Sequence, residues 1–458
     1  MILFDKEHSR EFENKANFSP TQTIVFAFLG IIIVGTCLLL LPVSSGDGKS
    51  VNLMTALFTA TSAVCITGLS LCDTWTQWSS FGQFVILALI EIGGLGFMSA
   101  MVLFLYLFHR RIGLKQRMLM AQAMGVSDTG GILRLQNWML KSSLLAQGIG
   151  TFLLFLYFCR EYPPLYAFKL GIFHAVSAYC NAGFDIFGFI EPGASLIHFA
   201  EEPFVLLVLS FLIIYGGLGF LVLEQWTRIR NFRKLNVYAK IVIVMTVFLL
   251  LFGTIAFCIT EWNNPETIGD FSFWNKISGA FFQSVTSRTA GFAAMDQGKM
   301  SEAGKALTTL LMMVGGASGS TAGGIKVGTL AVILLFLRAR SQGQNEASIA
   351  NRTINNEQVL DAMTIAFIMT VLALFGCVFI SITSHVNLAT GLFEAVSALS
   401  NTGLSTGGTA NLSPSTHILL IIYMFFGRVG VFSISLSFLI RNRAEGRIHY
   451  ADTKMMIG

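Results

Sequence analysis

Charged side chains are scarce in this chain. Only 12% of its 458 residues are Asp, Glu, Lys or Arg, and 54% are hydrophobic. A soluble domain usually carries about 25% charged residues. The mean hydropathy is +0.68. These values exclude a water-soluble protein of several domains, and they predict a polytopic membrane protein built as one bundle in the lipid bilayer.

Several common kinds of functional site are also missing. The seven cysteines lie mostly inside apolar segments, with no CxxC pair and no metal-ligand spacing, so we expect them to be small packing residues. The seven histidines are scattered, which argues against the polar cluster of a membrane enzyme. The first fifteen residues are charged and polar, so no cleavable signal peptide is expected. We expect no enzyme, no covalently bound cofactor and no nucleic-acid partner.

The chain instead contains one segment in four copies. They read LFTATSAVCITGL at 57–69, IFHAVSAYCNAGF at 172–184, AFFQSVTSRTAGF at 280–292 and LFEAVSALSNTGL at 392–404. In each copy a phenylalanine stands ten residues before a glycine. These glycines are Gly68, Gly183, Gly291 and Gly403, spaced 115, 108 and 112 residues apart. The near-equal spacing predicts four quarters arranged around one axis.

Each copy lies between two apolar runs long enough to span a bilayer, which takes about 20 residues. The runs expected before the copies are Thr23–Leu41, Met139–Phe158, Ile241–Ile259 and Met363–Ile382. Those expected after them are Phe81–Phe108, Phe204–Leu223, Leu307–Leu337 and Ile418–Ile440. The copies themselves are too short and too polar to span. The predicted fold class is an all-α membrane protein with eight transmembrane helices and four re-entrant pore helices around a pseudo-four-fold pore.

This pattern divides the chain into an N-terminal segment, four repeats and a tail. The expected boundaries are 1–20 for the N-terminus, 21–117, 118–234, 235–341 and 342–443 for the repeats, and 444–458 for the tail. With the N-terminus, the tail and the loops between repeats on one side, that side holds 21 Lys and Arg. The opposite loops hold 6 and the membrane region 3, which accounts for all 30. Both termini are therefore predicted to be cytoplasmic, and the exterior to be acidic.

The ends of the four copies are the candidate ion-binding residues, which we call the filter segments. They are Val64, Cys65, Ile66, Thr67 and Gly68; Tyr179, Cys180, Asn181, Ala182 and Gly183; Ser287, Arg288, Thr289, Ala290 and Gly291; and Leu399, Ser400, Asn401, Thr402 and Gly403. Non-helical backbone at membrane depth is tolerated where it lines a water-filled path. Rings of carbonyl oxygens replace the hydration shell of K⁺. Four ordinary helix hairpins with kinking glycines are the alternative, which four aligned copies disfavour.

A second recurrence follows each filter segment. Glycine clusters stand at 93–96, 216–219, 315–319 and 427–430, midway along the second span of each quarter. In the first two quarters, close packing of helices through small residues is an alternative interpretation. The third cluster extends to residue 326, where no helix is expected to survive, and a merely kinked helix is the alternative. It forms the candidate gate: Gly315, Gly316, Ala317, Ser318, Gly319, Ser320, Thr321, Ala322, Gly323, Gly324 and Lys326. A phosphate-binding loop is disfavoured because the GK[ST] ending is absent.

Arg428, Arg288 and Glu91 are ionisable residues inside the predicted membrane region, and each calls for an explanation. A charge at mid-span costs ~2.5–3.5 kcal/mol or more, so Arg428 should face a polar interior. Arg288 lies within the third filter segment, where it would either support the filter or reach the surface. Glu91, before the first glycine cluster, would pair with a neighbouring span.

Over nearly its whole length the chain resembles the Ktr/Trk/HKT superfamily of K⁺ transporters, whose four M1–P–M2 repeats share one polypeptide. The likeness is closest to the membrane subunit of bacterial Ktr systems (KtrB/KtrD). The resemblance implies that the four glycines favour K⁺, that 315–326 is an intramembrane gating loop, and that Arg428 faces the conduction path beside this loop and belongs to the candidate gate. It also implies that Arg288 braces the third filter segment from behind by bonding backbone carbonyls. The third copy departs from the usual proline of that subunit at Ser287.

The same resemblance implies the wider assembly. We expect a homodimer in the bacterial plasma membrane, with the segment 447–458 at the dimer interface. It would sit on a cytosolic RCK-type nucleotide-binding ring (KtrA/KtrC-like), so nucleotide control would come only through that partner. Transport of K⁺ would be passive or coupled to Na⁺. The remaining alternatives are the ion-binding subunit of an ATP-driven K⁺ pump and a secondary cation transporter. The second would need intramembrane acids, of which Glu91 is the clear candidate.

Overall fold

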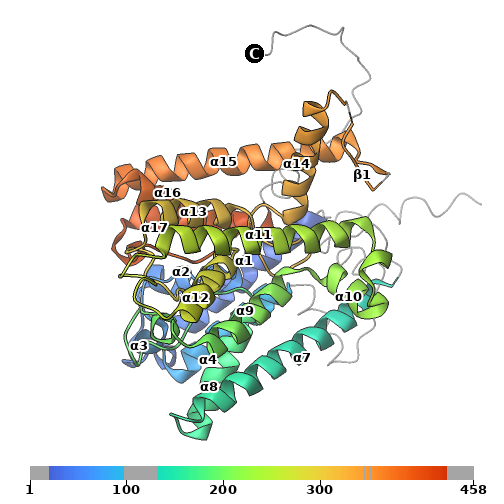
Figure 1. Cartoon of the computed structure of the whole chain (residues 1–458). Coiled ribbons are helices and arrows are strands. Elements are labelled where there is room, and N and C mark those ends of the chain that lie inside the picture. The colour runs from blue at the N-terminus through green and yellow to red at the C-terminus, as the bar shows by residue number, and fades with distance from the viewer. Residues whose placement is uncertain (1–19, 97–130, 345, 351, 431–458) are drawn as a thin grey trace, which may run out of the picture.

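The computed structural model describes residues 20–96, 131–344, 346–350 and 352–430, and these residues are mostly helical (Figure 1). The helices are α1 Pro20–Leu39, α2 Leu53–Val64, α3 Thr74–Gln77, α4 Ser80–Leu95, α7 Ile132–Phe158, α8 Pro164–Tyr179, α9 Pro203–Gly217, α10 Phe220–Ile229, α11 Val237–Glu261, α12 Phe273–Thr286, α13 Glu302–Met313, α14 Val327–Ser341, α15 Asn356–Ser384, α16 Leu388–Leu399 and α17 Pro414–Val429. Two short antiparallel strands, β1 Ser348–Ile349 and β2 Arg352–Thr353, join α14 to α15.

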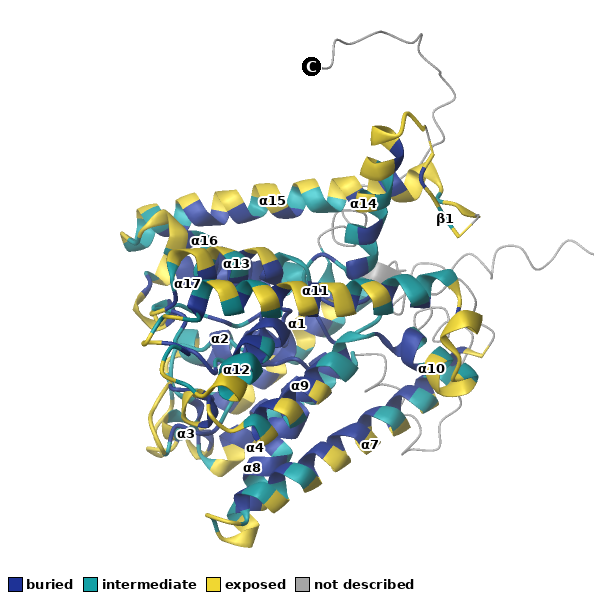
Figure 2. Ribbon diagram, in the orientation of Figure 1, coloured by how far each residue is buried: buried dark blue, intermediate teal, exposed yellow. Residues whose placement is uncertain are grey.

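Within the described residues, four unbroken helices are long and apolar enough to cross a membrane: α1, α7, α11 and α15. They include all four runs expected before the copies except Leu40 and Leu41. Three of them begin well before the apolar run, and polar caps explain two of these starts. Asn236 accepts a hydrogen bond from Ala239 N before α11, and Asn355 accepts one from Glu357 N before α15. Their outward faces are exposed and apolar, as lipid contact requires (Figure 2).

A shorter helix follows each long one and packs against it: α2, α8, α12 and α16. These are the repeated segments. Each begins at the surface and ends buried, so its last turn lies inside the molecule (Figure 2). Asn52, Ser272 and Asn387 cap three of them by accepting a hydrogen bond from a first-turn amide, and α8 begins at Pro164 instead.

The helices that follow the copies end at the glycine clusters. The expectation of one continuous helix over Phe204–Leu223 is wrong, because α9 and α10 meet at 99°. Leu307–Leu337 is interrupted between Met313 and Val327, as its glycine run predicts. Leu95 and Val429 end α4 and α17, and the remainder of those two expected spans lies outside the described residues.

Two different properties of glycine explain the breaks. Gly96, Gly219 and Gly430 have φ values of +82°, +87° and +92°, which side chains rarely adopt, and each follows the end of a helix. Earlier glycines allow close approach: a Cβ on Gly93 or Gly216 would lie within 3.0 Å of the carbonyl oxygen that ends the neighbouring short helix. Close packing through small residues is thus correct for Gly93 and Gly216. The end of the helix at each cluster is an additional consequence of the same glycines.

Candidate functional site

The four filter segments share one backbone conformation. Each has a non-glycine residue with positive φ two positions before its glycine: Ile66 (+53°), Asn181 (+57°), Thr289 (+68°) and Asn401 (+54°). The four glycines follow with φ of +89°, +68°, +85° and +91°. The chain therefore leaves each short helix along the same turned path, although the four sequences differ. The shared path explains why glycine recurs at the last position of each segment.

The four glycines form a closed ring. A Cβ on each would lie within 3.0 Å of the carbonyl oxygen that precedes the glycine of the next copy. The contacts run from Gly68 to Ala182, from Gly183 to Ala290, from Gly291 to Thr402 and from Gly403 to Thr67. Segments more than 100 residues apart thus meet at one place, in chain order and with no room for a side chain.

Hydroxyl groups of the short helices hold the filter segments in two different ways. In the first and fourth copies a serine accepts a hydrogen bond from the filter glycine amide, at 3.1 Å in both: Gly68 to Ser62 and Gly403 to Ser397. In the second and third copies a hydroxyl donates to the carbonyl after the glycine, at 2.7 Å in both: Ser177 to Phe184 and Thr286 to Phe292. Sequence reasoning missed these supports, although three of the four are a serine six residues before the glycine.

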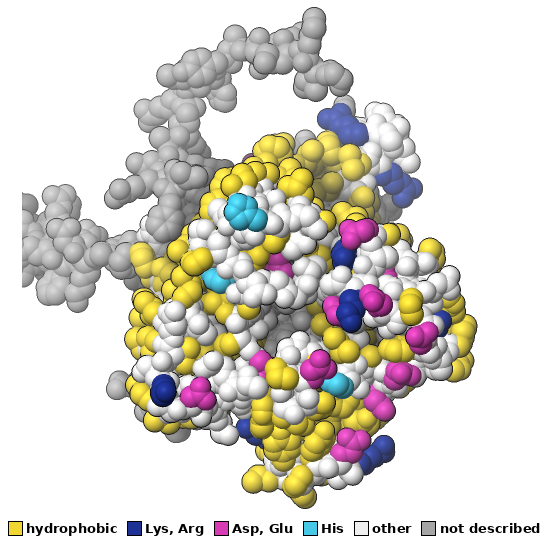
Figure 3. Space-filling view, turned by 90° about the vertical axis from the view of Figure 1, so that its left-hand side faces the viewer, with side chains coloured by type: hydrophobic (Ala, Val, Ile, Leu, Met, Phe, Trp, Pro, Cys, Tyr) yellow, Lys and Arg dark blue, Asp and Glu magenta, His cyan; other side chains and the backbone are white. Residues whose placement is uncertain are grey.

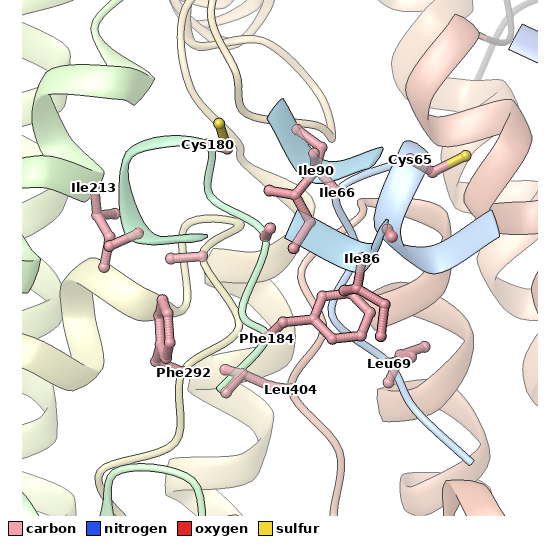
Figure 4. Close-up of a cluster of buried hydrophobic side chains, with 14 of the residues drawn as sticks. Cys65, Ile66, Leu69, Ile86, Ile90, Cys180, Phe184, Ile213, Phe292 and Leu404 are labelled. Carbon is pink, nitrogen blue, oxygen red and sulfur yellow. The ribbon is translucent and has the colours of Figure 1, made fainter. Parts of the chain in front are cut away.

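Apolar side chains surround the filter segments (Figure 4). Leu69, Phe184, Phe292 and Leu404, each directly after a filter glycine, lie at one end of the segments. Cys65 and Cys180 lie toward the other end. All six side chains are buried, so apolar groups pack around both ends of the segments. A surrounding of low polarity strengthens the interaction of backbone dipoles with any charge held between the segments.

Arg288 is buried, and its Nη2 donates to the carbonyl oxygen of Gly315 at 2.9 Å. It therefore bonds a backbone carbonyl, as the sequence predicts, but the carbonyl belongs to the glycine-rich loop and not to the third filter segment. A cavity of about 20 Å³ lies beside it, lined also by Asn181 and Gly217. Arg288 thus ties the third filter segment to the first residue of the loop.

The two ends of the loop 315–326 pair with each other, and the loop is hydrogen-bonded to the second quarter. Val314 pairs with Ile325, and Gly315 N donates to Ile325 O at 3.0 Å. On the other side, Ala317 N donates to Gly217 O at 3.0 Å. These bonds satisfy backbone groups that a helix would otherwise have paired. The loop is an ordered structure with fixed partners.

Thr321 brings the loop to the end of the second short helix. Its Oγ1 donates to the carbonyl oxygen of Tyr179 at 3.3 Å, and its amide donates to Gly216 O at 3.3 Å. At the opposite side of the loop, a Cβ on Gly323 would collide with the carbonyl oxygen of Ser400 in the fourth filter segment. The loop is therefore wedged between the second and fourth copies, next to their filter segments.

Arg428 connects this loop to the first quarter. Its Nη1 donates to Thr321 O at 2.9 Å, and its Nη2 donates to the carbonyl oxygens of Gly93 and, at 3.2 Å, Gly94. Both glycines belong to the last turn of α4, where helix carbonyls carry partial negative charge. Lys326 is satisfied within the loop, through the carbonyl oxygen of Ala322 at 2.6 Å. The described residues therefore bring every candidate gate charge into contact with loop carbonyls.

Glu91 does pair with a neighbouring span. Its Oε2 accepts a hydrogen bond from Gln147 Nε2 of α7 at 2.9 Å and one from the Cys180 thiol at 3.3 Å. Two further acids are fully buried: Glu261 at the end of α11 and Glu394 within α16. Hydrogen-bond donors surround both carboxylates, which the sequence pattern did not indicate.

Loops near the filter glycines form a polar recess beside the filter segments. A cavity of about 620 Å³ is lined by Ala293 and Ser405, shortly after two filter glycines, together with the acids Glu191, Glu201, Glu266 and Asp296. Figure 3 shows Asp and Glu side chains gathered on this face. Burial raises the pKa of Asp185, just after the second filter segment, to about 6, and the Asp73 carboxylate adds to the rise. The acidity predicted for this side is thus concentrated near the filter.

Comparison with known proteins matches residues 2–446 to the family TrkH, described as cation transport protein. Potassium/sodium uptake protein NtpJ of Enterococcus hirae is 38% identical, over 97% of this chain and 98% of its own length. Ktr system potassium uptake protein B of Bacillus subtilis is 35% identical, over 96% and 97%. The potassium transporter TrkH from Vibrio parahaemolyticus has the same fold, with a TM-score of 0.71 at 17% identity over 92% of this chain and 86% of that one.

Proposed function

Because the chain belongs to the TrkH family of cation transport proteins, we propose that it takes up potassium ions across the plasma membrane. The structural observation that carries this proposal is the closed ring of the four filter glycines. The ring joins the four copies at one point inside an otherwise apolar bundle. Such a point is where a cation would cross.

The filter segments would select K⁺ through their backbone. The carbonyl oxygens of Ala182, Ala290, Thr402 and Thr67 each lie against the filter glycine of the preceding copy in the ring, and they would supply the oxygen ligands that a dehydrated K⁺ requires. The short helices end at the inner side of the filter segments, so their partly negative C-termini favour a cation there. Selectivity would then depend on carbonyl geometry, which explains why side chains differ between the copies.

The gate would be the loop 315–326 together with Arg428. Its support is the set of bonds that fix the loop beside the second and fourth filter segments. A guanidinium in the conduction path repels a cation, and the loop backbone narrows that path. Opening would require the bond from Arg428 to Thr321 to break and the loop to move aside.

The chain would be organised as four M1–P–M2 repeats with eight transmembrane helices and both termini in the cytoplasm. Long helices α1, α7, α11 and α15 would be the first spans, α2, α8, α12 and α16 the pore helices, and the broken helices the second spans. The distribution of Lys and Arg supports the orientation. The acidic recess beside the filter would then face outward, where it concentrates cations.

The protein would act as a homodimer on a cytosolic nucleotide-binding ring. Relatives at 31–38% identity include uptake proteins named as parts of a Ktr system, which supports a partner subunit. Another relative is named for both potassium and sodium, which supports a role for Na⁺. The segment 447–458 expected at the dimer interface lies outside the described residues.

Rubidium uptake in a host that lacks its own K⁺ uptake systems tests the function. Cells expressing the chain should accumulate Rb⁺, with and without the candidate ring subunit, and added Na⁺ should raise the rate. Absence of uptake from a membrane-inserted protein in the presence of the ring subunit would overturn the proposal. Rb⁺ uptake at a rate independent of Na⁺ would be consistent with K⁺ transport but would refute coupling to Na⁺.

A further inference from the structure

Glu394 is a buried acid to which the proposed pathway assigns no role. It lies in α16, nine residues before Gly403, and its side chain is fully buried. No ion pair to it exists among the described residues. A buried carboxylate without a cation persists only where hydrogen bonds compensate for the lost water. Its hydrogen-bond partners therefore indicate what it does.

All of these partners belong to the stretch that leaves the fourth filter segment. Ser405 Oγ donates to Glu394 Oε1 at 2.6 Å, and Thr406 N donates to the same oxygen at 3.1 Å. Thr409 Oγ1 donates to Oε2 at 2.8 Å. Ser405 stands two residues after the filter glycine, so the carboxylate fixes the chain directly at the outer end of the fourth segment. Hydrogen bonds to a charged group are the strong ones.

The second copy contains the same contact with a different side chain. His174 occupies the position of Glu394 in its copy, nine residues before Gly183. Its Nε2 accepts a hydrogen bond from Ile186 N at 3.3 Å. Ile186 and Thr406 each stand three residues after their filter glycine, so both side chains hold the same backbone amide. The contact is thus present in the second and fourth copies, whereas the first and third copies have Thr59 and Phe282 at the equivalent position.

The residues that Glu394 binds are also connected to the first copy. Thr409 O is 2.9 Å from His417 Nε2, and the His417 ring stands edge-on to Phe58 of α2, with centroids 5.9 Å apart. In the first copy, the equivalent residue Thr59 is buried, and its hydroxyl has no partner among the described residues. Glu394 therefore supports the side of the ring where the fourth and first copies meet.

We propose that Glu394 is a positioning residue for ion selectivity, holding Ser405–Thr409 so that the outer end of the fourth filter segment keeps its geometry. The inference rests on the proposed function, because it assigns the residue to that same filter. Its role is to accept hydrogen bonds. A side chain that retains an acceptor oxygen should therefore preserve selectivity, and one of similar size without an acceptor should not.

The test is the ratio of K⁺ to Na⁺ permeation in proteoliposomes. Glu394→Leu, which keeps the volume and removes both oxygens, should lower the ratio about tenfold. Glu394→Gln, which keeps the oxygen facing Ser405 and Thr406, should stay within about threefold of the wild type. Glu261→Leu is the matched control, because Glu261 is equally buried and bonds Ser301, Asn264 and Thr267, away from the filter.

Each outcome of this test either supports the inference or overturns it. An unchanged ratio in Glu394→Leu overturns the inference, as does an equal fall in Glu261→Leu, which would indicate general destabilisation. A fall in Glu394→Gln as large as in Glu394→Leu overturns the hydrogen-bond role in favour of charge. If Glu394→Leu does not insert, the double variant S405A/T409V removes two donors instead, and an unchanged ratio there overturns the inference. A wild type that carries no K⁺ overturns the proposed function itself.

Discussion

At the scale of single residues, the filter depends on backbone conformations that most side chains resist. Ile66 and Thr289 are β-branched and yet have φ of +53° and +68°, at a cost of order 1–3 kcal/mol each. Asn181 and Asn401 hold the same position, and asparagine tolerates this conformation better. The strain is shared by all four copies, which indicates that the path of the carbonyls is the property being maintained.

Gly68→Ser should reduce the preference for K⁺ over Na⁺ by about tenfold or more. The new Cβ would lie 2.5 Å from Ala182 O, so the ring must widen, and a wider ring suits a K⁺-sized site less well. Gly131→Ser is the matched control, because Gly131 has φ of +83° with nothing within 4 Å. Competition of Na⁺ with Rb⁺ uptake measures the effect. Selectivity that is unchanged in Gly68→Ser would refute the filter assignment.

Arg428→Ala should speed K⁺ permeation severalfold. The substitution removes a positive charge from the path and frees the loop from the bond to Thr321. Arg428→Lys keeps the charge but loses the guanidinium contact with the Gly93 and Gly94 carbonyls. Its permeation rate should therefore fall between those of the wild type and Arg428→Ala. Flux into proteoliposomes at equal protein content measures all three. Slower flux in a folded Arg428→Ala protein would show that the arginine is not a barrier.

At the scale of elements, α4, α9, α13 and α17 each end close to a filter segment. A continuous helix would fill the space below the ring with side chains and pair all its backbone groups internally. The breaks at Leu95, Gly217, Met313 and Val429 instead leave backbone groups available, and those of α4 and the loop 315–326 bind Arg428. The interruptions thus create the polar surroundings that let a charge remain within the membrane region.

Deleting residues 316–323 should raise K⁺ flux severalfold if the loop is the gate. The deletion is compatible with folding because Gly315 N already donates to Ile325 O, and Val314 pairs with Ile325, so the two ends of the cut lie together. Rb⁺ uptake at matched expression measures the effect, with the chromatographic profile of the purified protein as the folding control. Reduced flux from a well-folded variant would make the loop a structural support.

At the scale of the whole molecule, the outer and inner loops differ in charge, and this difference predicts the orientation. Asp47→Cys, in the exposed turn after α1, should react with a membrane-impermeant maleimide in intact cells. Arg233→Cys, in the exposed turn between α10 and α11, should react only after permeabilisation. The wild type, with its seven cysteines, sets the background. The reverse pattern would invert the proposed topology.

Sequence alone was sufficient for the alternation of long and short helices among the described residues. Apolar runs and the four copies predicted the four long helices and the short helices that follow them. They also predicted the interruption after Met313, where five glycines stand in ten residues. Each of these features is local, because apolar periodicity, capping and glycine content act within a few neighbouring residues. The family resemblance rested on the same copies.

Only the tertiary structure decided which groups meet. The 99° bend after α9, the contact of Arg288 with Gly315 and the burial of Glu394 depend on segments that are distant in the chain. Nothing in LFEAVSALSNTGL distinguishes an acid facing water from one that holds Ser405 and Thr409. A glutamate at the surface and a buried, fully hydrogen-bonded glutamate are identical in the sequence. The hydrogen-bond donors that distinguish them are brought together only by the fold.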